Sequence, residues 1–201
     1  MQSLSDVILA SGSPRRRSIL AAAGVGFAVM VPVIDDALLP ADGEDPARLV
    51  MALAWFKARQ VDRDCAALGG PGPRWIVAAD TMCFDGAAPI GKPADAADAR
   101  RMVARFEGRS HDVLTGLCVL DRRTGVRRIL SDAARVWLGA LPPGELDGYV
   151  ASGDWRGKAG GYNFADRVAA GWPLRCEGDP ETVMGLPSRL VLPLLRVQEA
   201  A

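Results

Sequence analysis

The stretch VILASGSPRRRSIL, residues 7–20, indicates how this chain begins to fold. Its first four residues, Val7 to Ala10, form an apolar run of the length of a buried strand. Ser13 and Pro14 then signal a helix start, because a hydroxyl caps the first turn and the proline ring fits the first helical position. A strand that leads through small residues into a helix predicts an α/β protein.

Three consecutive arginines, Arg15, Arg16 and Arg17, occupy the first turn of this predicted helix. Cations there oppose the positive end of the helix dipole, at a cost of roughly 0.3–1 kcal/mol each. Together with the backbone amides and the hydroxyls of Ser11 and Ser13, the guanidinium groups form a site for an anion such as a phosphate chain. The alternative is a solvated helix start whose arginines extend into water.

The composition is that of a globular protein with balanced charge. The 201 residues include 24 Lys and Arg and 24 Asp and Glu, so no global charge favours a nucleic-acid or membrane partner. We expect a single domain over residues 1–201, with two lobes and no separable linker. No apolar run approaches the roughly 20 residues of a membrane span, and the polar start lacks a signal region. The predicted location is the cytoplasm.

Cysteine and histidine usage narrows the chemistry. The four cysteines are far apart and form no CxxC pair, which favours buried free thiols over a metal site or disulfides. His111 is the one histidine, which argues against zinc hydrolases and Ser-His-Asp catalysis. Acid–base work would fall to carboxylates or lysines, and a metal ion would be a hard one such as Mg²⁺ or Mn²⁺.

Strand-like and helix-like segments alternate along the chain. The apolar patterns predict strands at residues 27–34, 75–79, 111–120 and 125–138, and helices at 45–68, 95–106, 144–151 and 188–197. Asp85 and Gly86 predict a hairpin turn. The glycine-rich residues 153–187 are expected to form a region of loops and short strands. Pro193 is expected to interrupt or kink the last helix.

Several charged residues stand where open α/β sheets bind ligands. Asp35 and Asp36 end the second predicted strand, and Asp80 and Thr81 follow the buried run 75–79. The alternative for Asp80 is a turn or helix-capping residue. Lys57 lies in the middle of a predicted helix, where an exposed lysine is the simpler interpretation. A glycine and a proline flank Lys92 and restrict its loop.

The segment LASGSPRRRSIL resembles the Maf family of nucleoside triphosphate pyrophosphatases, also described as septum-formation inhibitors. The resemblance continues in chain order over nearly the whole sequence. It includes Asp35-Asp36, LAWFKA around Lys57, Ala78–Thr81, Gly91–Pro93, Gly108–Val113 with Thr115-Gly116, Tyr149–Gly153, Lys158–Gly160 and Val183–Pro187. Each of these motifs alone is weak evidence for the family, whereas all of them in this order are specific for it.

The resemblance implies a hydrolase that converts a nucleoside triphosphate to the monophosphate and pyrophosphate, with a divalent cation, Mg²⁺ or Mn²⁺. The implied fold is an elongated mixed, twisted sheet with flanking helices in two lobes around a cleft, similar to inosine triphosphate pyrophosphatases. Members of the family are often dimeric, so a homodimer is one expectation.

The resemblance also assigns roles to residues. Phosphate binding falls to Ser11, Ser13, Arg15, Arg16, Lys57 and Lys92, with the two lysines acting from across the cleft. Asp80 is the expected general base for water and a metal ligand. Asp36 is the expected second ligand, with Asp35 as a close alternative. Thr81 matches a position linked to substrate choice, whereas Arg17 is expected to be a solvated bystander.

One segment departs from the family pattern. Members similar to dTTP and UTP enzymes carry Tyr-x-Ile-Gln-Gly, where this chain has Tyr162-Asn163-Phe164-Ala165-Asp166. Ala165 offers no side-chain hydrogen bond, so a base-reading amide is lost unless Asn163, Asp166 or Arg167 replaces it. Thr81 and Arg16 point to a pyrimidine, and the missing glutamine points away from it. The altered loop also motivates an alternative function, a nucleotide-binding regulator of cell division with weak or no catalysis.

Overall fold

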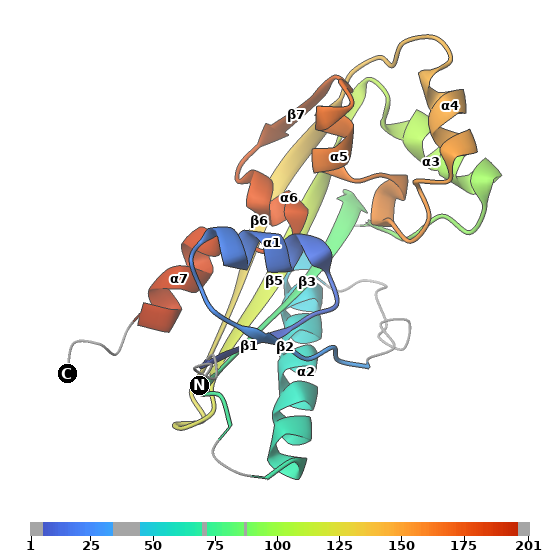
Figure 1. Cartoon of the computed structure of the whole chain (residues 1–201). Coiled ribbons are helices and arrows are strands. Elements are labelled where there is room, and N and C mark those ends of the chain that lie inside the picture. Colours follow the sequence, from blue (N-terminus) through green and yellow to red (C-terminus); the bar gives the residue numbers. More distant parts are fainter. Residues whose placement is uncertain (1–5, 34–44, 70–71, 87, 197–201) are drawn as a thin grey trace.

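The fold is α/β, as predicted, and its centre is a mixed sheet that runs along the elongated molecule (Figure 1). The computed structural model describes residues 6–33, 45–69, 72–86 and 88–196. The strands are β1 (Val7–Ala10), β2 (Ala28–Val29), β3 (Trp75–Asp85), β4 (Ala88–Ile90), β5 (Arg109–Asp121), β6 (Arg127–Leu138) and β7 (Leu174–Glu177). Their order is β2-β1-β3-β5-β6-β7, with β4 paired to β3. Strands β2, β1 and β3 are parallel, and the remaining pairs are antiparallel.

Helices flank the sheet along its length. They are α1 (Pro14–Ala22), α2 (Pro46–Ala67), α3 (Ala96–Phe106), α4 (Glu145–Ser152), α5 (Phe164–Ala169), α6 (Pro180–Met184) and α7 (Ser188–Arg196), with a 3-10 turn η2 (Ala159–Gly161). The expected caps are present at two helices, because the side chain of Ser13 accepts from the amide of Arg16 and that of Asp45 accepts from the amide of Ala47. No helix in the described part of the chain is long and apolar enough to cross a lipid bilayer.

Side-chain alternation along the strands divides the core between the two faces of the sheet. On one face, alternate residues such as Leu9, Val77 and Leu117 pack with buried residues of α1 and α7. On the other face, Ile8, Ala78 and Cys118 belong to the cluster that contains the apolar side of α2. A third cluster joins α3, α4 and the aromatic residues Tyr149, Trp155, Tyr162 and Trp172 at the far end of the sheet.

Strand β3 is longer than its neighbours on one side, and this leaves part of its edge open. Strand β1 pairs with β3 only as far as Ala78, and β4 pairs with it from Cys83 onward. Among the described residues, no strand covers residues 79–82 on that side, whereas β5 pairs with them on the other. The open edge lies between the end of β1 and the hairpin, and it carries Asp80 and Thr81.

Helix α2 approaches the sheet most closely at Gly116. A Cβ atom at this position would lie 2.1 Å from the carbonyl oxygen of Val50. Gly116 pairs with Asp80 in the β3–β5 ladder, so the close approach occurs beside that carboxylate. The absence of a side chain therefore lets α2 lie against the sheet at the level of the candidate site.

Three expectations need correction. The strand predicted at residues 27–34 is present only at Ala28–Val29. Its partner β1 is only four residues long, and Pro32 has no amide proton to donate to a neighbouring strand. Ile34 lies outside the described residues. Asp80 does not end its strand, because β5 continues the ladder as far as Phe84. The region 153–187 is more helical than expected, with α5 and α6 starting at the caps Asn163 and Asp179.

The other predicted elements are confirmed with small shifts in their boundaries. Strands β3 and β4 pair antiparallel, with Asp85 opposite Ala88 and Gly86 in a turn, as expected for a hairpin. The two long antiparallel strands follow as β5 and β6. The expected interruption at Pro193 does not occur, because α7 runs from Ser188 to Arg196 with Pro193 inside the helix; Val197 lies outside the described residues. All four cysteines are free, but only Cys65 and Cys118 are buried as expected, whereas Cys83 and Cys176 are partly exposed.

Candidate active site

The loop between β1 and α1 is organised around the hydroxyl of Ser11. This buried oxygen accepts hydrogen bonds from the amide of Ser13 at 3.1 Å and from Nη1 of Arg16 at 3.2 Å. Both of its lone pairs are therefore in use, and its O–H proton remains as a donor. Arg15, in the same turn, is exposed and forms no ion pair with any described residue. The loop thus presents a hydroxyl donor and a cation.

The guanidinium group of Arg16 joins three separate segments. Besides its bond to Ser11, it donates from Nε to the carbonyl oxygen of Gly185 at 2.8 Å and from Nη2 to Oγ1 of Thr81 at 3.0 Å. A planar fork of donors suits this arrangement, because each N–H points in a fixed direction. Arg16 therefore holds the start of α1, strand β3 and the end of α6 in one geometry.

The hydrogen bond between Thr81 and Thr115 has a defined direction. The two hydroxyl oxygens are 2.8 Å apart. The hydroxyl of buried Thr115 donates to the carbonyl oxygen of Thr182 at 2.7 Å, so it can only accept from Thr81. The proton of Thr81 is therefore committed within the protein. Thr81 faces the cleft as an acceptor, not as a donor.

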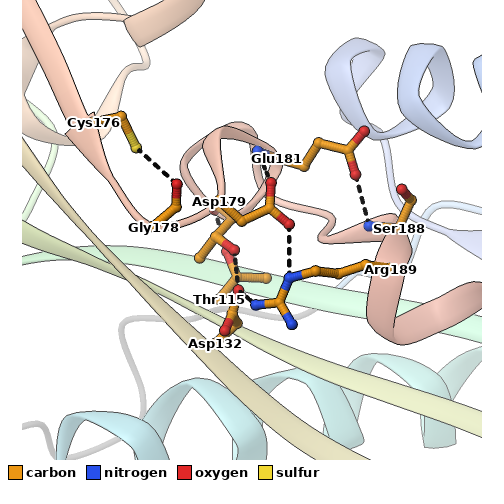
Figure 2. A network of polar contacts seen from close by, with 9 residues as sticks. Thr115, Asp132, Cys176, Gly178, Asp179, Glu181, Ser188 and Arg189 are labelled. Carbon is orange, nitrogen blue, oxygen red and sulfur yellow. Dashed lines mark hydrogen bonds and ion pairs between the residues drawn. The ribbon is translucent and has the colours of Figure 1, made fainter.

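Beyond Thr115, polar contacts continue across α6 to α7 (Figure 2). The hydroxyl of Thr182 donates to Oδ2 of Asp132 on β6, and the same oxygen receives Nη2 of Arg189. Arg189 also donates from Nε to Asp179, the cap of α6, at 3.1 Å. These contacts attach the short helix α6 to the sheet and to α7, and so fix one side of the cleft.

Asp80 and Lys57 form an ion pair on the face of the sheet that α2 covers. Nζ of Lys57 contacts Oδ1 of Asp80, and the two side chains are 13% and 9% exposed. Alternation along β3 explains the placement, since Asp80 shares a face with Ala78, whereas Thr81 points to the opposite face with Arg16. Lys57 is thus a largely buried partner of a carboxylate and not an exposed helical lysine.

A cleft of about 190 Å³ lies beside the open edge of β3. Five of the expected site residues line it, namely Ser13, Arg15, Arg16, Thr81 and Lys92. Lys158 adds a further positive side chain from the other side. No acidic side chain is found among the described residues that line the cleft. A cleft lined by one sign of charge attracts ligands of the opposite sign.

The remaining expected residues border the cleft without lining it. Ser11 contacts Arg16, and Asp80 precedes Thr81 on the uncovered part of β3. Among the described residues no strand covers this edge, which separates the cleft on the face of Thr81 from Asp80 and Lys57 on the other face. Asp35 and Asp36, the expected acidic pair, lie outside the described residues.

Several lining residues were not singled out as site residues from the sequence. They include His111, Lys158, Tyr162, Asn163, Phe164, Val183 and Met184. Lys158 lies in a motif that carries the family resemblance, and Asn163 lies in the atypical segment, so both had a sequence signal. Val183 and Met184 also lie in such a motif, Val183–Pro187, but their apolar character gave no reason to place them in a cleft, because an apolar side chain in a cleft has the same sequence pattern as one in the core.

His111 is a buried, neutral residue at the floor of the cleft. Its ring stacks on Phe106 with centroids 4.2 Å apart, and its Nε2 lies 3.3 Å from the hydroxyl of Tyr162. Burial lowers the pKa of His111 to about 4, although Asp112 and Asp85 act in the opposite direction. Burial also raises the pKa of Tyr162. Neither ring carries charge at neutral pH.

The described residues suit a metal ion that is bound mainly through the phosphates of a substrate and only partly through protein side chains. No group of three or more His, Cys, Asp or Glu side chains suited to a metal ion occurs among the described residues. Asp80 supplies a carboxylate at the site, and Mg²⁺ is commonly bound through one or two carboxylates together with substrate phosphates and water. The residues therefore fit a cation that arrives with a phosphate chain better than a site built from protein alone.

Comparisons with a family model and with individual proteins point to the same family. A sequence model of a family described as "Maf-like protein" matches residues 6–198. A protein of Burkholderia thailandensis named dTTP/UTP pyrophosphatase is 39% identical over 201 residues, covering 97% of this chain and 94% of the relative. Proteins of the same name from Geotalea uraniireducens and Salinibacter ruber are 39% and 36% identical, and the alignments cover 98% and 100% of this chain and 96% and 94% of the relatives.

Proposed function

The chain belongs to the Maf-like protein family, and on that premise we propose that it hydrolyses nucleoside triphosphates to nucleoside monophosphate and pyrophosphate. One observation carries this proposal: a cleft lined by Arg15, Arg16, Lys92 and Lys158 reaches β3 at Thr81, the residue that directly follows Asp80 in the chain. A triphosphate needs several positive groups, and its hydrolysis needs a base for water.

The phosphate chain is bound by groups from both sides of the cleft. Ser11, Ser13, Arg15 and Arg16 provide hydroxyl and guanidinium donors at the start of α1, next to the backbone amides of the first turn. Lys92 provides a cation from the loop after β4. It is exposed and forms no ion pair with any described residue, so its charge is available to a ligand.

Asp80 is the proposed general base. Its carboxylate takes a proton from water, whose oxygen attacks phosphorus while the bond between the α- and β-phosphates breaks and pyrophosphate leaves. Lys57 orients this carboxylate through the ion pair. With Asp80 and Asp36 as protein ligands, a bound Mg²⁺ or Mn²⁺ would neutralise charge on the phosphate oxygens.

The relatives named above make dTTP and UTP the first substrates to test. Location in the cytoplasm and assembly as a homodimer stay predictions. That the ligands are small nucleotides and not nucleic acids also stays a prediction. A membrane partner is likewise not part of the proposal.

The deciding experiment is incubation of the purified protein with a panel of nucleoside triphosphates and Mg²⁺ or Mn²⁺. Pyrophosphate and the monophosphate are the expected first products. Orthophosphate as the first product would instead indicate a phosphatase. Tight nucleotide binding without turnover, across all bases and both metals, would favour the regulator of cell division over the enzyme.

A further inference from the structure

The side-chain amide of Asn163 is held in one orientation at the edge of the cleft. Asn163 lines the cleft and is 8% exposed. Its Oδ1 accepts a hydrogen bond from the amide of Ala165 at 3.0 Å and thereby caps α5. This bond determines which end of the amide is oxygen, so Nδ2 is the end left for other contacts. The Nδ2 group donates to none of the residues that the structure describes.

Two other hydroxyl groups that line the cleft, those of Thr81 and Tyr162, are already engaged. The proton of Thr81 goes to Thr115, as the direction of that hydrogen bond requires. The hydroxyl of Tyr162 contacts the ring nitrogen of His111. A ligand that needs a neutral donor from this part of the wall therefore meets the amide of Asn163.

The two other residues that could replace the missing base-reading amide, Asp166 and Arg167, are directed elsewhere. Asp166 pairs with Lys158 at 3.5 Å. The guanidinium of Arg167 lies over the rings of Tyr149 and Trp172 and pairs with Asp154. Neither Asp166 nor Arg167 lines the cleft. Of the three residues that could supply a base-reading group, Asn163 is the one that the fold places there.

The position of Asn163 suits the base end of a nucleotide. Helix α6 contacts both α1 and α5, and α5 lies on the side of α6 away from α1 (Figure 1). The arginines of the phosphate loop are therefore separated from α5 by α6. Phe164, Val183 and Met184 line the cleft around this end with apolar surface. Apolar surface against the ring faces and one polar group at the ring edge is the usual form of a base site.

We propose that Asn163 reads the nucleobase, and that its two fixed N–H donors select bases with a keto oxygen over bases with an amino group at the same ring position. The proposal rests on the function proposed above, since it assumes a nucleotide in this cleft. Uracil and thymine carry O4 where cytosine carries an amino group, and guanine carries O6 where adenine carries one. An amino group facing Nδ2 places donor against donor and leaves both unsatisfied.

The test compares UTP with CTP, which share sugar and phosphates and differ at this edge. For the natural protein we expect kcat/KM for UTP to exceed that for CTP by about tenfold, the value of one well-placed hydrogen bond. Asn163→Asp retains a good helix cap and replaces the donors by acceptors. The UTP to CTP ratio should fall to about one or invert, although the added negative charge lowers both rates.

A second variant and a second readout separate the possible results. Asn163→Ser keeps a cap without adding charge and should also remove the preference. Binding of uncleavable α,β-imido analogues of UTP and CTP reports base selection without turnover. Keto-selective binding without pyrophosphate release would reject the proposed activity and support the role of Asn163. Equal binding of the two analogues by the natural protein, or a ratio that Asn163→Asp leaves unchanged, would overturn the inference.

Discussion

The guanidinium of Arg16 donates from Nε to the carbonyl oxygen of Gly185, at 2.8 Å across 169 positions of the chain. The contact requires glycine, because a Cβ at residue 185 would lie 2.9 Å from Oγ1 of Thr81, and the backbone there has a φ of +99°. An arginine that is expected to bind phosphate thus also holds α6 beside the cleft. The proposed phosphate binding by Arg16 would therefore be coupled to the position of α6 through this one side chain.

Replacement of Arg16 by lysine should reduce activity although the charge is kept. The ammonium cannot reproduce three directed hydrogen bonds, so α6 and Thr81 lose their common anchor. We expect kcat/KM to fall roughly 10- to 100-fold, as for small displacements of binding groups. The matched control is Arg17→Lys, since Arg17 is exposed and does not line the cleft. Equal behaviour of the two variants in steady-state kinetics would contradict the anchoring role.

Asp80→Asn should abolish most turnover and spare nucleotide binding. The change removes the base but little volume, and general bases contribute roughly 10²- to 10⁴-fold. Pyrophosphate release and equilibrium binding of an uncleavable analogue measure the two effects. Asp85→Asn serves as the control, because Asp85 lies on the same strand in an exposed ion pair with Arg105. Full activity of Asp80→Asn would show that another group takes the proton.

The buried pair of Lys57 and Asp80 should couple stability to the site. Lys57→Met removes the lysine partner of a carboxylate that is nine-tenths buried, and breaking such pairs costs roughly 3–5 kcal/mol. The double variant Lys57→Met, Asp80→Asn should recover part of this loss, because no charge then remains in the pair. Urea denaturation of the two single variants and the double variant measures the coupling energy. Additive losses would mean that the pair contributes nothing of its own.

Gly116→Ala should destabilise the protein, because the new methyl group meets the backbone of α2 at Val50. Overpacking of this kind costs typically 1–3 kcal/mol, and the displacement of α2 should also lower activity by moving Lys57. Gly148→Ala is the control, since it lies inside α4 with no atom within 4 Å of the added carbon. We expect that change to be neutral or to stabilise α4 by up to about 1 kcal/mol. Thermal unfolding of both variants distinguishes the two environments.

His111 should make the folded state sensitive to mild acid. Burial lowers its pKa from 6.5 to about 4, so between these values the unfolded chain binds a proton that the folded protein does not. The stabilisation is fully present above pH 6.5 and is lost as the pH falls toward 4, by an amount on the order of 3 kcal/mol. Denaturation midpoints measured between pH 7.5 and 4.5 should fall less steeply for His111→Gln. An unchanged slope in that variant would place the acid sensitivity in other groups.

Local sequence chemistry was sufficient for most of the secondary structure. The apolar run 7–10 and the pair Ser13-Pro14 predict β1 and the start of α1 because strand burial and helix capping depend on neighbours within a few residues. The same reasoning located α2, α3, β5 and β6. It failed for residues 27–34, where strand length depends on the partner, and in the region 153–187, where short helices depend on caps and packing.

The sequence by itself also supplied the residue types for phosphate chemistry and, through the ordered motifs, the family. It could not supply the relation between Asp80 and Thr81, which are neighbours in the chain and serve opposite faces of the sheet. That separation arises from strand pairing beyond the expected strand end, and the partners Lys57, Thr115 and Gly185 come from distant segments. Hydrogen-bond direction at Thr81 and Asn163 is likewise set by groups brought together only by folding. Periodicity and capping are local, whereas register, burial and donor orientation are properties of the packed chain.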